Sequence, residues 1–426
     1  MESDNPRVFF NTTVPSSTFI CGSQGSGKSH TFSCLLENCL IPSIASKLPK
    51  APTGLVFHYD TFASDNSSSP CEVAFLASNN NIRVRVLCSP TNFRTINLTH
   101  LQRAHTAASK NILIEPLHIK RSDLSTKQML DLMAVSNNDG PMPLYLHTVY
   151  RVLREIRMEQ QETGGTFDYL QFKAKLLDSG LASQLGPLGQ RLETLESFMP
   201  ILQTAILVAN DEKKRNTSKG TDWSSKAGYL TIVDLSCPCV TPGGACSLFN
   251  ICLGIFLEQF PEIGEVIALD EAHKAEAETL TNTLLSAIRL QRHLGAQIII
   301  STQEPTISPR LLDLCSVSIV HRFTSPDWLR ALRQHLAGAA IINSKADDWG
   351  ELSLGSEYHA AKYLFDQIVT LKVGQALLFS PNAIIGWKIG PKSRDISAVK
   401  RLGGEFLKFQ IRSRIAEDGG KSVMAN

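Results

Sequence analysis

A short glycine-rich segment near the amino end has the residue types and spacing of a phosphate-binding loop. It fits the pattern G-x-x-x-x-G-K-S without a departure. Glycines let the backbone curl so that successive N–H groups point at phosphate oxygens, and the helix that follows adds the positive end of its dipole. Lys28 should reach the β and γ phosphates, and the Ser29 hydroxyl should ligand Mg²⁺. The residues expected to hold the nucleotide are Gly22, Ser23, Gln24, Gly25, Ser26, Gly27, Lys28, Ser29 and His30.

A second candidate is an acidic pair that follows a strongly apolar run. Asp270 and Glu271 come directly after 266–269, a run typical of a buried central strand. Phosphoryl transfer to water needs a carboxylate for Mg²⁺ and a group that orients or deprotonates the water. Ligands bind at the carboxyl edge of open α/β sheets, so we expect Asp270 to serve the metal there and Glu271 to be the base. Both residues could instead cap the next helix.

Gln303 is a third candidate, because it lies just beyond an apolar strand that ends at Ser301. A glutamine at a strand tip beside the site could sense the γ phosphate or position water. The same glutamine stands two residues before Pro305, where it is also ordinary turn chemistry.

The order of apolar segments predicts the fold that must position these residues. The run 18–21 is a strand before the glycine loop, and 30–40 has helical spacing after it. Strands and helices alternate again after residue 228, which indicates a mainly parallel sheet with helices on both faces. From about 111 to 210 the apolar residues recur at the helical period, which predicts a large helical insertion.

These shifts divide the chain into four parts. The predicted parts are the first half of an α/β core at 1–110, a mainly helical insertion at 111–227, the second half of the core at 228–390 and a C-terminal tail at 391–426. Within them, 376–380 and 384–389 are predicted to form a terminal hairpin, and the tail beyond Arg414 is expected to fray.

Composition points to an ordinary folded protein inside the cell. The 43% hydrophobic and 19% charged residues lie far from the disordered and membrane regimes. A formal net charge of +2 supplies no long-range field for nucleic acid or anionic membranes. The ten cysteines lack the density of a secreted disulfide scaffold, and the polar N-terminus resembles no targeting segment. We expect an intracellular location, in cytoplasm or nucleus, without a membrane anchor.

Three segments in this order resemble the HerA/FtsK superfamily of P-loop ATPases. They are Asp-Glu-Ala-His at 270–273, Leu-Gln-Arg-His-Leu-Gly at 290–295 and Ile-Ile-Ile-Ser-Thr-Gln-Glu-Pro at 298–305. The superfamily includes DNA pumps and type IV secretion motors. The likeness extends from 18 to 380 and implies a P-loop NTPase with a mainly parallel, RecA-like sheet, with ATP as the nucleotide and Mg²⁺ as its metal.

The resemblance also implies roles for single residues. Glu271 would activate water, Gln303 would act as a sensor, and Arg292, or else Arg289, would reach the nucleotide of a neighbouring subunit in a homo-oligomeric, hexameric ring. Arg292 is equally well interpreted as a solvated helix arginine. The glycine loop begins at Gly22, which leaves no room for the N-terminal β-barrel of the archaeal DNA-processing members. The fold and the ATPase chemistry therefore carry over better than DNA translocation does.

Other interpretations have weaker support in the sequence. The letters Asp-Glu-Ala-His match the name of a helicase class, but no second nucleotide-binding lobe follows downstream. Cys237, Cys239 and Cys246 with His273 lack the paired spacing of a zinc site. The densest basic cluster, within 213–219, has the composition of a solvated loop.

Two functions of different classes remain open. The first is a Mg²⁺-dependent ATP hydrolase, a ring-forming motor for which DNA is a conceivable substrate. The second is an ATP-dependent switch or scaffold whose helical insertion binds a protein partner. The oligomeric state and the response of ATP turnover to DNA distinguish the two.

Overall fold

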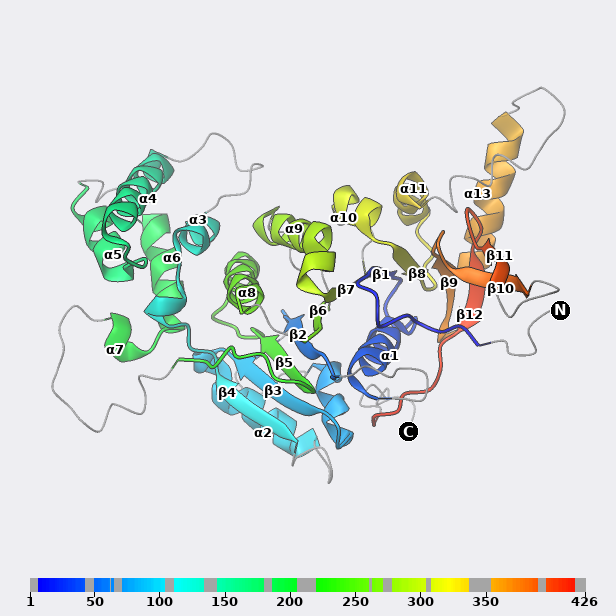
Figure 1. Cartoon of the computed structure of the whole chain (residues 1–426), viewed down its shortest axis with the longest axis horizontal. Coiled ribbons are helices and arrows are strands. Elements are labelled where there is room, and N and C mark those ends of the chain that lie inside the picture. Colours follow the sequence, from blue (N-terminus) through cyan, green and yellow to red (C-terminus); the bar gives the residue numbers. More distant parts are fainter. Residues whose placement is uncertain are drawn as a thin grey trace.

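A ten-stranded sheet forms the centre of the protein in a computed structural model of the chain (Figure 1). Its strand order is β12-β9-β8-β1-β7-β6-β2-β5-β3-β4, and all neighbours from β8 to β4 run parallel. The structure describes residues 7–42, 50–61, 63–64, 71–103, 111–133, 144–179, 186–204, 220–259, 263–270, 278–303, 308–336, 354–389 and 396–417.

The strands are short and mostly buried on both faces. They are β1 (Ser17–Cys21), β2 (Thr53–His58), β3 (Arg83–Cys88), β4 (Ile112–Pro116), β5 (Tyr229–Asp234), β6 (Glu265–Leu269), β7 (Ala296–Thr302), β8 (Val317–Val320), β9 (Gln375–Phe379), β10 (Ile384–Ile389), β11 (Ile396–Arg401) and β12 (Leu407–Gln410). Continuous apolar runs suit strands that helices cover on both sides, because every side chain then enters a core.

Helices cover both faces of the sheet. The α-helices within the described residues are α1 (Lys28–Leu40), α2 (Phe93–Arg103), α3 (Thr126–Met133), α4 (Leu144–Thr163), α5 (Tyr169–Leu177), α6 (Gly186–Ser197), α7 (Ile201–Thr204), α8 (Pro242–Leu257), α9 (Glu278–Leu294), α10 (Pro309–Leu314), α11 (Pro326–His335) and α13 (Leu354–Val369).

Alternate residues of the central strands enter two separate cores. On β1, Phe19 packs into the core that includes α8 to α11, whereas Ile20 packs into the core under α1. Figure 1 shows these two layers, with α1 and α2 on one side of the sheet and α8 to α11 on the other. The predicted alternation of strands and helices is thus the observed α/β fold.

The helices α3 to α7 form a lobe at one end of the molecule (Figure 1). The lobe joins the sheet through α3 and α6, which contact α8. The segment predicted as a helical insertion, which starts at 111, contains one strand of the sheet, because β4 pairs in parallel with β3. The run at 112–116 is short and only partly buried, as expected of a strand at the sheet edge, so its apolar pattern gave little signal.

The predicted hairpin between 376–380 and 384–389 is wrong. Strand β9 instead pairs antiparallel with β8 and β12, while β10 pairs antiparallel with β11 in a separate two-stranded sheet. The turn residues between β9 and β10 permit a hairpin, but pairing with β8 and β12 places β9 inside the large sheet, where Ala376 and Leu377 are fully buried.

No described helix is long and apolar enough to cross a membrane.

The predicted frayed tail is also wrong for its first residues. Residues 411–417, here called the C-terminal strap, follow β12 and lie against α1. The buried carboxylate of Glu37 in α1 accepts hydrogen bonds from Arg412 Nη1 at 2.6 Å and from the backbone N–H of Ala416 at 2.9 Å. Arg414, another strap residue, pairs with Glu72 at 2.7 Å. The strap is fixed because a buried carboxylate needs these donors.

Glu265 at the start of β6 gives a prediction for the pH dependence of stability. Its side chain is 1% exposed, neither carboxylate oxygen has a hydrogen-bond partner among the described residues, and burial raises its pKa to about 7. The folded protein therefore keeps a proton that the unfolded chain releases above its ordinary pKa of 4.5. Stability should fall as the pH rises from about 4.5 to 7 and stay level above that.

Glu265→Gln removes this penalty. At pH 8 the variant should gain unfolding free energy on the order of 2 kcal/mol over the native chain, and the gain should vanish at pH 4. Urea unfolding at the two pH values measures both. An equal effect at pH 4 and pH 8 would show that Glu265 does not titrate in this range.

Candidate functional site

The loop between β1 and α1 has the geometry of an anion-binding site. Gly22, Gly25 and Gly27 have φ values of 154°, 72° and 103°, which side-chain-bearing residues rarely adopt. Gly27 is the N-cap of α1; no side chain caps this helix, and its first turn has no acidic residue. The amino end of α1 thus presents N–H groups and a positive dipole end that a phosphate group satisfies.

The side chains of Ser26 and Lys28 turn toward the inside of the loop. The Ser26 hydroxyl donates to the carbonyl of Ser23 at 2.7 Å, and Lys28 Nζ donates to the same carbonyl at 3.1 Å. Lys28 is 5% exposed, so its charge lies inside the curl of the loop rather than in solvent. Ser29 is half-buried in the first turn of α1. His30 Nε2 lies 2.8 Å from the carbonyl of Arg412, which joins the end of the loop to the C-terminal strap.

Asp270 lies at the same edge of the sheet as the loop. It follows β6, which is separated from β1 by β7 alone, and all three strands are parallel. Asp270 is 8% exposed, and its N–H donates to Phe57 in β2 at 3.2 Å. A Ser29 hydroxyl and an Asp270 carboxylate are the oxygen donors that Mg²⁺ prefers. Glu271 lies outside the described residues.

Gln303 occupies the strand position between the loop and Asp270. The register pairs Cys21 with Thr302, so Gln303 stands level with Gly22, the first residue of the loop. It is half-buried. The parallel sheet thus brings the loop, Gln303 and Asp270 to the carboxyl ends of three adjacent strands.

Arg292 lies elsewhere. It is exposed in the last turn of α9, which ends two residues before β7 begins, at the opposite edge of the sheet from the loop. Arg289, one turn earlier, is also exposed. Arg292 therefore lies away from the glycine loop of the same chain.

The structure adds a row of three titratable residues, Asp234, His58 and Asp270, at neighbouring strand ends, which the sequence analysis missed. His58 ends β2 and pairs in register with Asp234, which ends β5, while Asp270 follows the strand on the other side of β2. Burial alone would lower the pKa of His58, but Cys71 and the carboxylates of Asp234 and Asp270 raise it to about 10. His58 therefore lies beside Asp234 at the carboxyl edge of the sheet, next to the candidate metal ligand Asp270. A lone histidine at a strand end carries no motif that predicts this.

Comparison with known proteins gives similarity in structure but none in sequence. No protein-family profile and no curated protein matches the chain. The solved structure of VirB4 of Thermoanaerobacter pseudethanolicus is similar, with a TM-score of 0.53 at 11% identity over 94% of this chain and 90% of VirB4. This similarity spans nearly all of both chains and shows that they share a fold.

Two further structures are similar at lower scores. The plasmid coupling protein TrwB in complex with ADP and Mg²⁺ has a TM-score of 0.47 at 10% identity, over 97% of this chain and 91% of TrwB. The DNA-packaging ATPase B204 from Sulfolobus turreted icosahedral virus has a TM-score of 0.34 at 11% identity, over 86% and 93% of the two chains.

Proposed function

We propose that this chain, which shares the fold of VirB4 and resembles the HerA/FtsK P-loop ATPases in its sequence motifs, binds ATP with Mg²⁺ and hydrolyses it. One observation carries this proposal: the amino end of α1 has no side-chain cap, and the buried amine of Lys28 lies inside the loop that precedes it. The amino end of a helix without a side-chain cap attracts an anion, a lysine inside the preceding loop adds to this attraction, and the triphosphate of a nucleotide supplies the anion.

We assign the residues of this chain as follows. The loop N–H groups and Lys28 bind the β and γ phosphates, and Ser29 and Asp270 hold Mg²⁺, which neutralises charge that develops on the phosphate oxygens. Glu271 accepts a proton from water as that water attacks the γ phosphorus. The bond between the γ phosphorus and the bridging oxygen breaks, so the products are ADP and inorganic phosphate. Gln303 orients the attacking water.

We further propose that copies of the chain assemble into a ring that acts on nucleic acid. Arg292 supports this part, because it is exposed at the far edge of its own sheet, where it can serve the nucleotide of a neighbouring subunit but not its own. The motor assignment itself rests on the sequence resemblance to the HerA/FtsK superfamily.

Turnover of ATP by the purified full chain tests the proposal. We expect Mg²⁺-dependent release of phosphate that double-stranded DNA increases several-fold over RNA or no polymer, and a hexamer in sedimentation with ATP. A protein that fails to bind ATP contradicts the whole proposal. A monomer whose turnover is indifferent to every polymer contradicts the motor alone.

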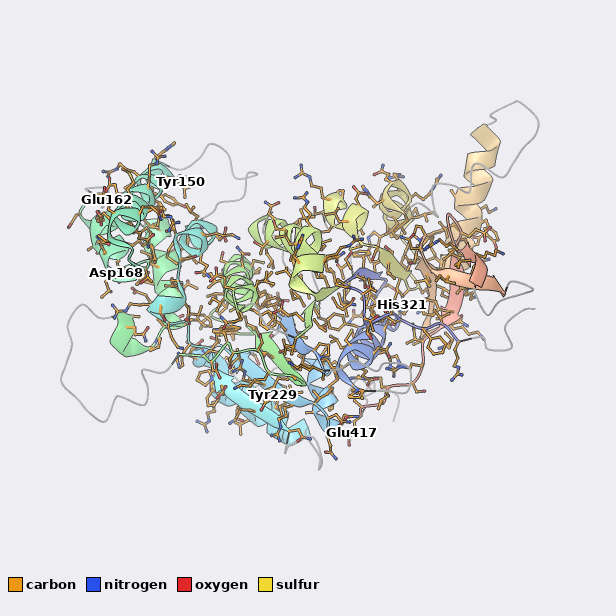
Figure 2. The ribbon with its side chains drawn as sticks, in the orientation of Figure 1. Tyr150, Glu162, Asp168, Tyr229, His321 and Glu417 are labelled. Atoms are coloured by element: carbon orange, nitrogen blue, oxygen red, sulfur yellow. The ribbon has the colours of Figure 1, made fainter. Side chains whose placement is uncertain are left out.

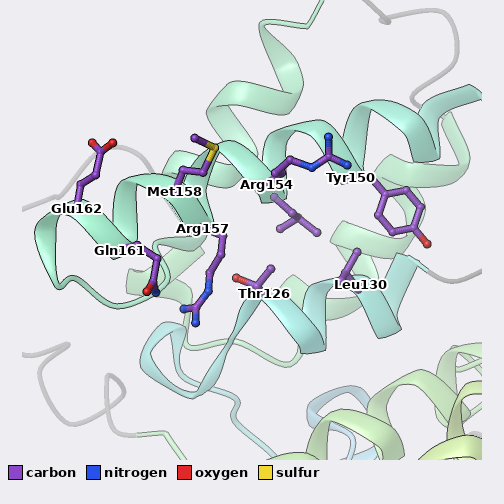
Figure 3. A pocket seen from close by; sticks show the side chains of 9 residues that line it. Thr126, Leu130, Tyr150, Arg154, Arg157, Met158, Gln161 and Glu162 are labelled. Carbon is purple, nitrogen blue, oxygen red and sulfur yellow. The ribbon is translucent and has the colours of Figure 1, made fainter.

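That last outcome favours a second candidate, a nucleotide-dependent switch whose helical lobe binds a protein. The observation behind it is a groove of about 470 Å³ between α3 and α4 (Figure 3). Tyr150 and Met158, which line it, are 43% and 61% exposed, so the groove offers apolar surface to a partner. The groove is lined by Thr126, Leu130, Tyr150, Leu153, Arg154, Arg157, Met158, Gln161 and Glu162.

The charges around the groove indicate what kind of protein surface it would fit. On the side of α4 that faces α5, Lys175 pairs with the carboxylates of Glu155 and Glu159. On the groove side, Arg154 has no ion pair among the described residues, and Arg157 contacts only an amide oxygen at 3.3 Å. Two arginines beside apolar side chains match an acidic, amphipathic segment of a partner.

A further inference from the structure

His321 is a buried residue at the candidate site that the mechanism above does not use. It directly follows β8, the neighbour of β1 on the side away from β7. Its N–H donates to the carbonyl of Cys21 at 2.8 Å, where β1 ends. The carbonyl of the next residue, Arg322, accepts from both the N–H and the hydroxyl of Ser23 at 2.9 Å. The end of β8 thus anchors the first turn of the glycine loop.

The side chain of His321 lies directly under this loop. It is fully buried, and Figure 2 labels it beside α1. A Cβ atom added to Gly22 would meet His321 Cβ at 2.6 Å, and one added to Gly27 would lie 3.7 Å from His321 Cε1. His321 therefore lies against both ends of the curl, through its Cβ at Gly22 and its ring at Gly27, and the loop can approach it so closely because these residues lack side chains.

A hydrogen-bonded chain connects the ring to the backbone of the loop. His321 Nε2 lies 2.8 Å from Thr31 Oγ1, and the Thr31 hydroxyl donates to the carbonyl of Gly27 at 3.2 Å. A hydroxyl has one proton, so when Thr31 donates it to Gly27, the imidazole must donate through Nε2–H. Gly27 is the N-cap of α1 and has positive φ, so this chain fixes the residue from which the phosphate-facing N–H groups begin.

The ring is suited to this role because it is neutral. Burial lowers the pKa of His321 to about 4, and the positive charge of Lys28 lowers it in the same direction. At neutral pH the imidazole can therefore donate one hydrogen bond without adding a second positive charge beneath the lysine.

We propose that His321 is a positioning residue that, through Thr31, holds the glycine loop in the curled conformation that receives the phosphates. This inference rests on the proposed function, because it concerns the affinity of the same loop for nucleotide. His321 should affect the affinity for nucleotide and the alignment of the loop rather than the chemical step, because it lies beneath the loop and not among the residues assigned to the reacting atoms.

Three variants test it in the full chain. His321→Leu keeps bulk without a donor, His321→Gln keeps a donor, and Thr31→Val removes the bridging hydroxyl with little change of shape. We expect His321→Leu and Thr31→Val each to weaken ATP binding about tenfold, measured as Kd by calorimetry, because each breaks the hydrogen bond between the ring and the Thr31 hydroxyl that holds the loop. His321→Gln should stay within about threefold of the native value. The matched control His335→Leu, on α11, should leave Kd unchanged.

The double variant separates a positioning role from a structural one. If the two residues act as one chain, His321→Leu with Thr31→Val should bind no more weakly than either single variant. KM for ATP should rise more than kcat falls, while thermal unfolding identifies any variant that is not folded. Should His321→Leu fail to fold, Thr31→Val and His321→Gln carry the test.

Each outcome has a separate meaning. Native Kd in folded His321→Leu or in Thr31→Val overturns the role of His321 and leaves the ATPase proposal standing. Failure of the native chain to bind ATP overturns the ATPase proposal itself. Strictly additive losses in the double variant show that the two residues act independently, which also contradicts the inference.

Discussion

Replacing Lys28 by alanine should abolish ATP binding at concentrations that saturate the native chain. The amine is 5% exposed and bonded across the loop to Ser23, so it is already held where the phosphates would enter. A buried charge-assisted contact of this kind contributes about 1.5–3 kcal/mol, and with two phosphates to neutralise we expect Kd to rise by at least 100-fold. Calorimetric titration with ATP and Mg²⁺ measures the change.

Lys127→Ala is the matched control, since this exposed lysine lies on α3 in the helical lobe. It should bind ATP as the native chain does. If Lys28→Ala keeps an affinity within about threefold of native while Lys127→Ala behaves the same way, the glycine loop is not the nucleotide site and the proposed function is wrong.

Local signals explain why much of the site could be predicted from the sequence. The glycine loop is a contiguous string, and its flanking strand and helix follow from the spacing of their own apolar residues. Asp270 could be placed at the carboxyl edge because the run before it is apolar throughout, which is typical of a central parallel strand. Each of these inferences uses residues within one turn or one strand of each other.

What could not be predicted depends on pairing between distant parts of the chain. Nothing in the sequence around His321 shows that β8 lies beside β1, so a single histidine after a short strand carries no signal of its contact with the loop. A glutamate within a helix, such as Glu37, is expected to face solvent. It is buried here because the C-terminal strap covers it. Likewise the turn after β9 favours pairing with β10, which follows it in sequence, whereas β9 pairs with the distant β8.

The same long-range contacts change how the site is understood. The loop is fixed to β8 through Arg322 and to the strap through His30, and Gly374 N, ahead of β9, lies 3.4 Å from the carbonyl of Ser26. Elements from the last quarter of the chain therefore surround a loop from its first tenth. Substitutions far from the loop in sequence should be screened for nucleotide affinity as well as for stability.

Replacing Glu271 by glutamine should leave ATP binding intact and reduce turnover by about 100-fold to 1,000-fold. The substitution keeps the shape and removes the carboxylate that accepts a proton from water, and general bases contribute rate factors of about this size. Asp270, the adjacent metal-side carboxylate, is untouched, so affinity for Mg²⁺ and ATP should stay within about threefold of native. Calorimetry and phosphate release, measured on the same preparation, separate the two effects.

A matched control lies at the other end of the same strand. Glu265→Gln makes the same chemical change at the start of β6, at the opposite edge of the sheet from the loop, and should leave kcat unchanged. Equal turnover in Glu271→Gln and native protein would remove Glu271 from the mechanism. The base would then have to be another carboxylate at this edge, and Asp234 is the first to test, because it lies in the row with His58 and Asp270. Loss of ATP binding in Glu271→Gln would instead mean that this residue serves the metal, and that the acidic pair must be assigned in the reverse order.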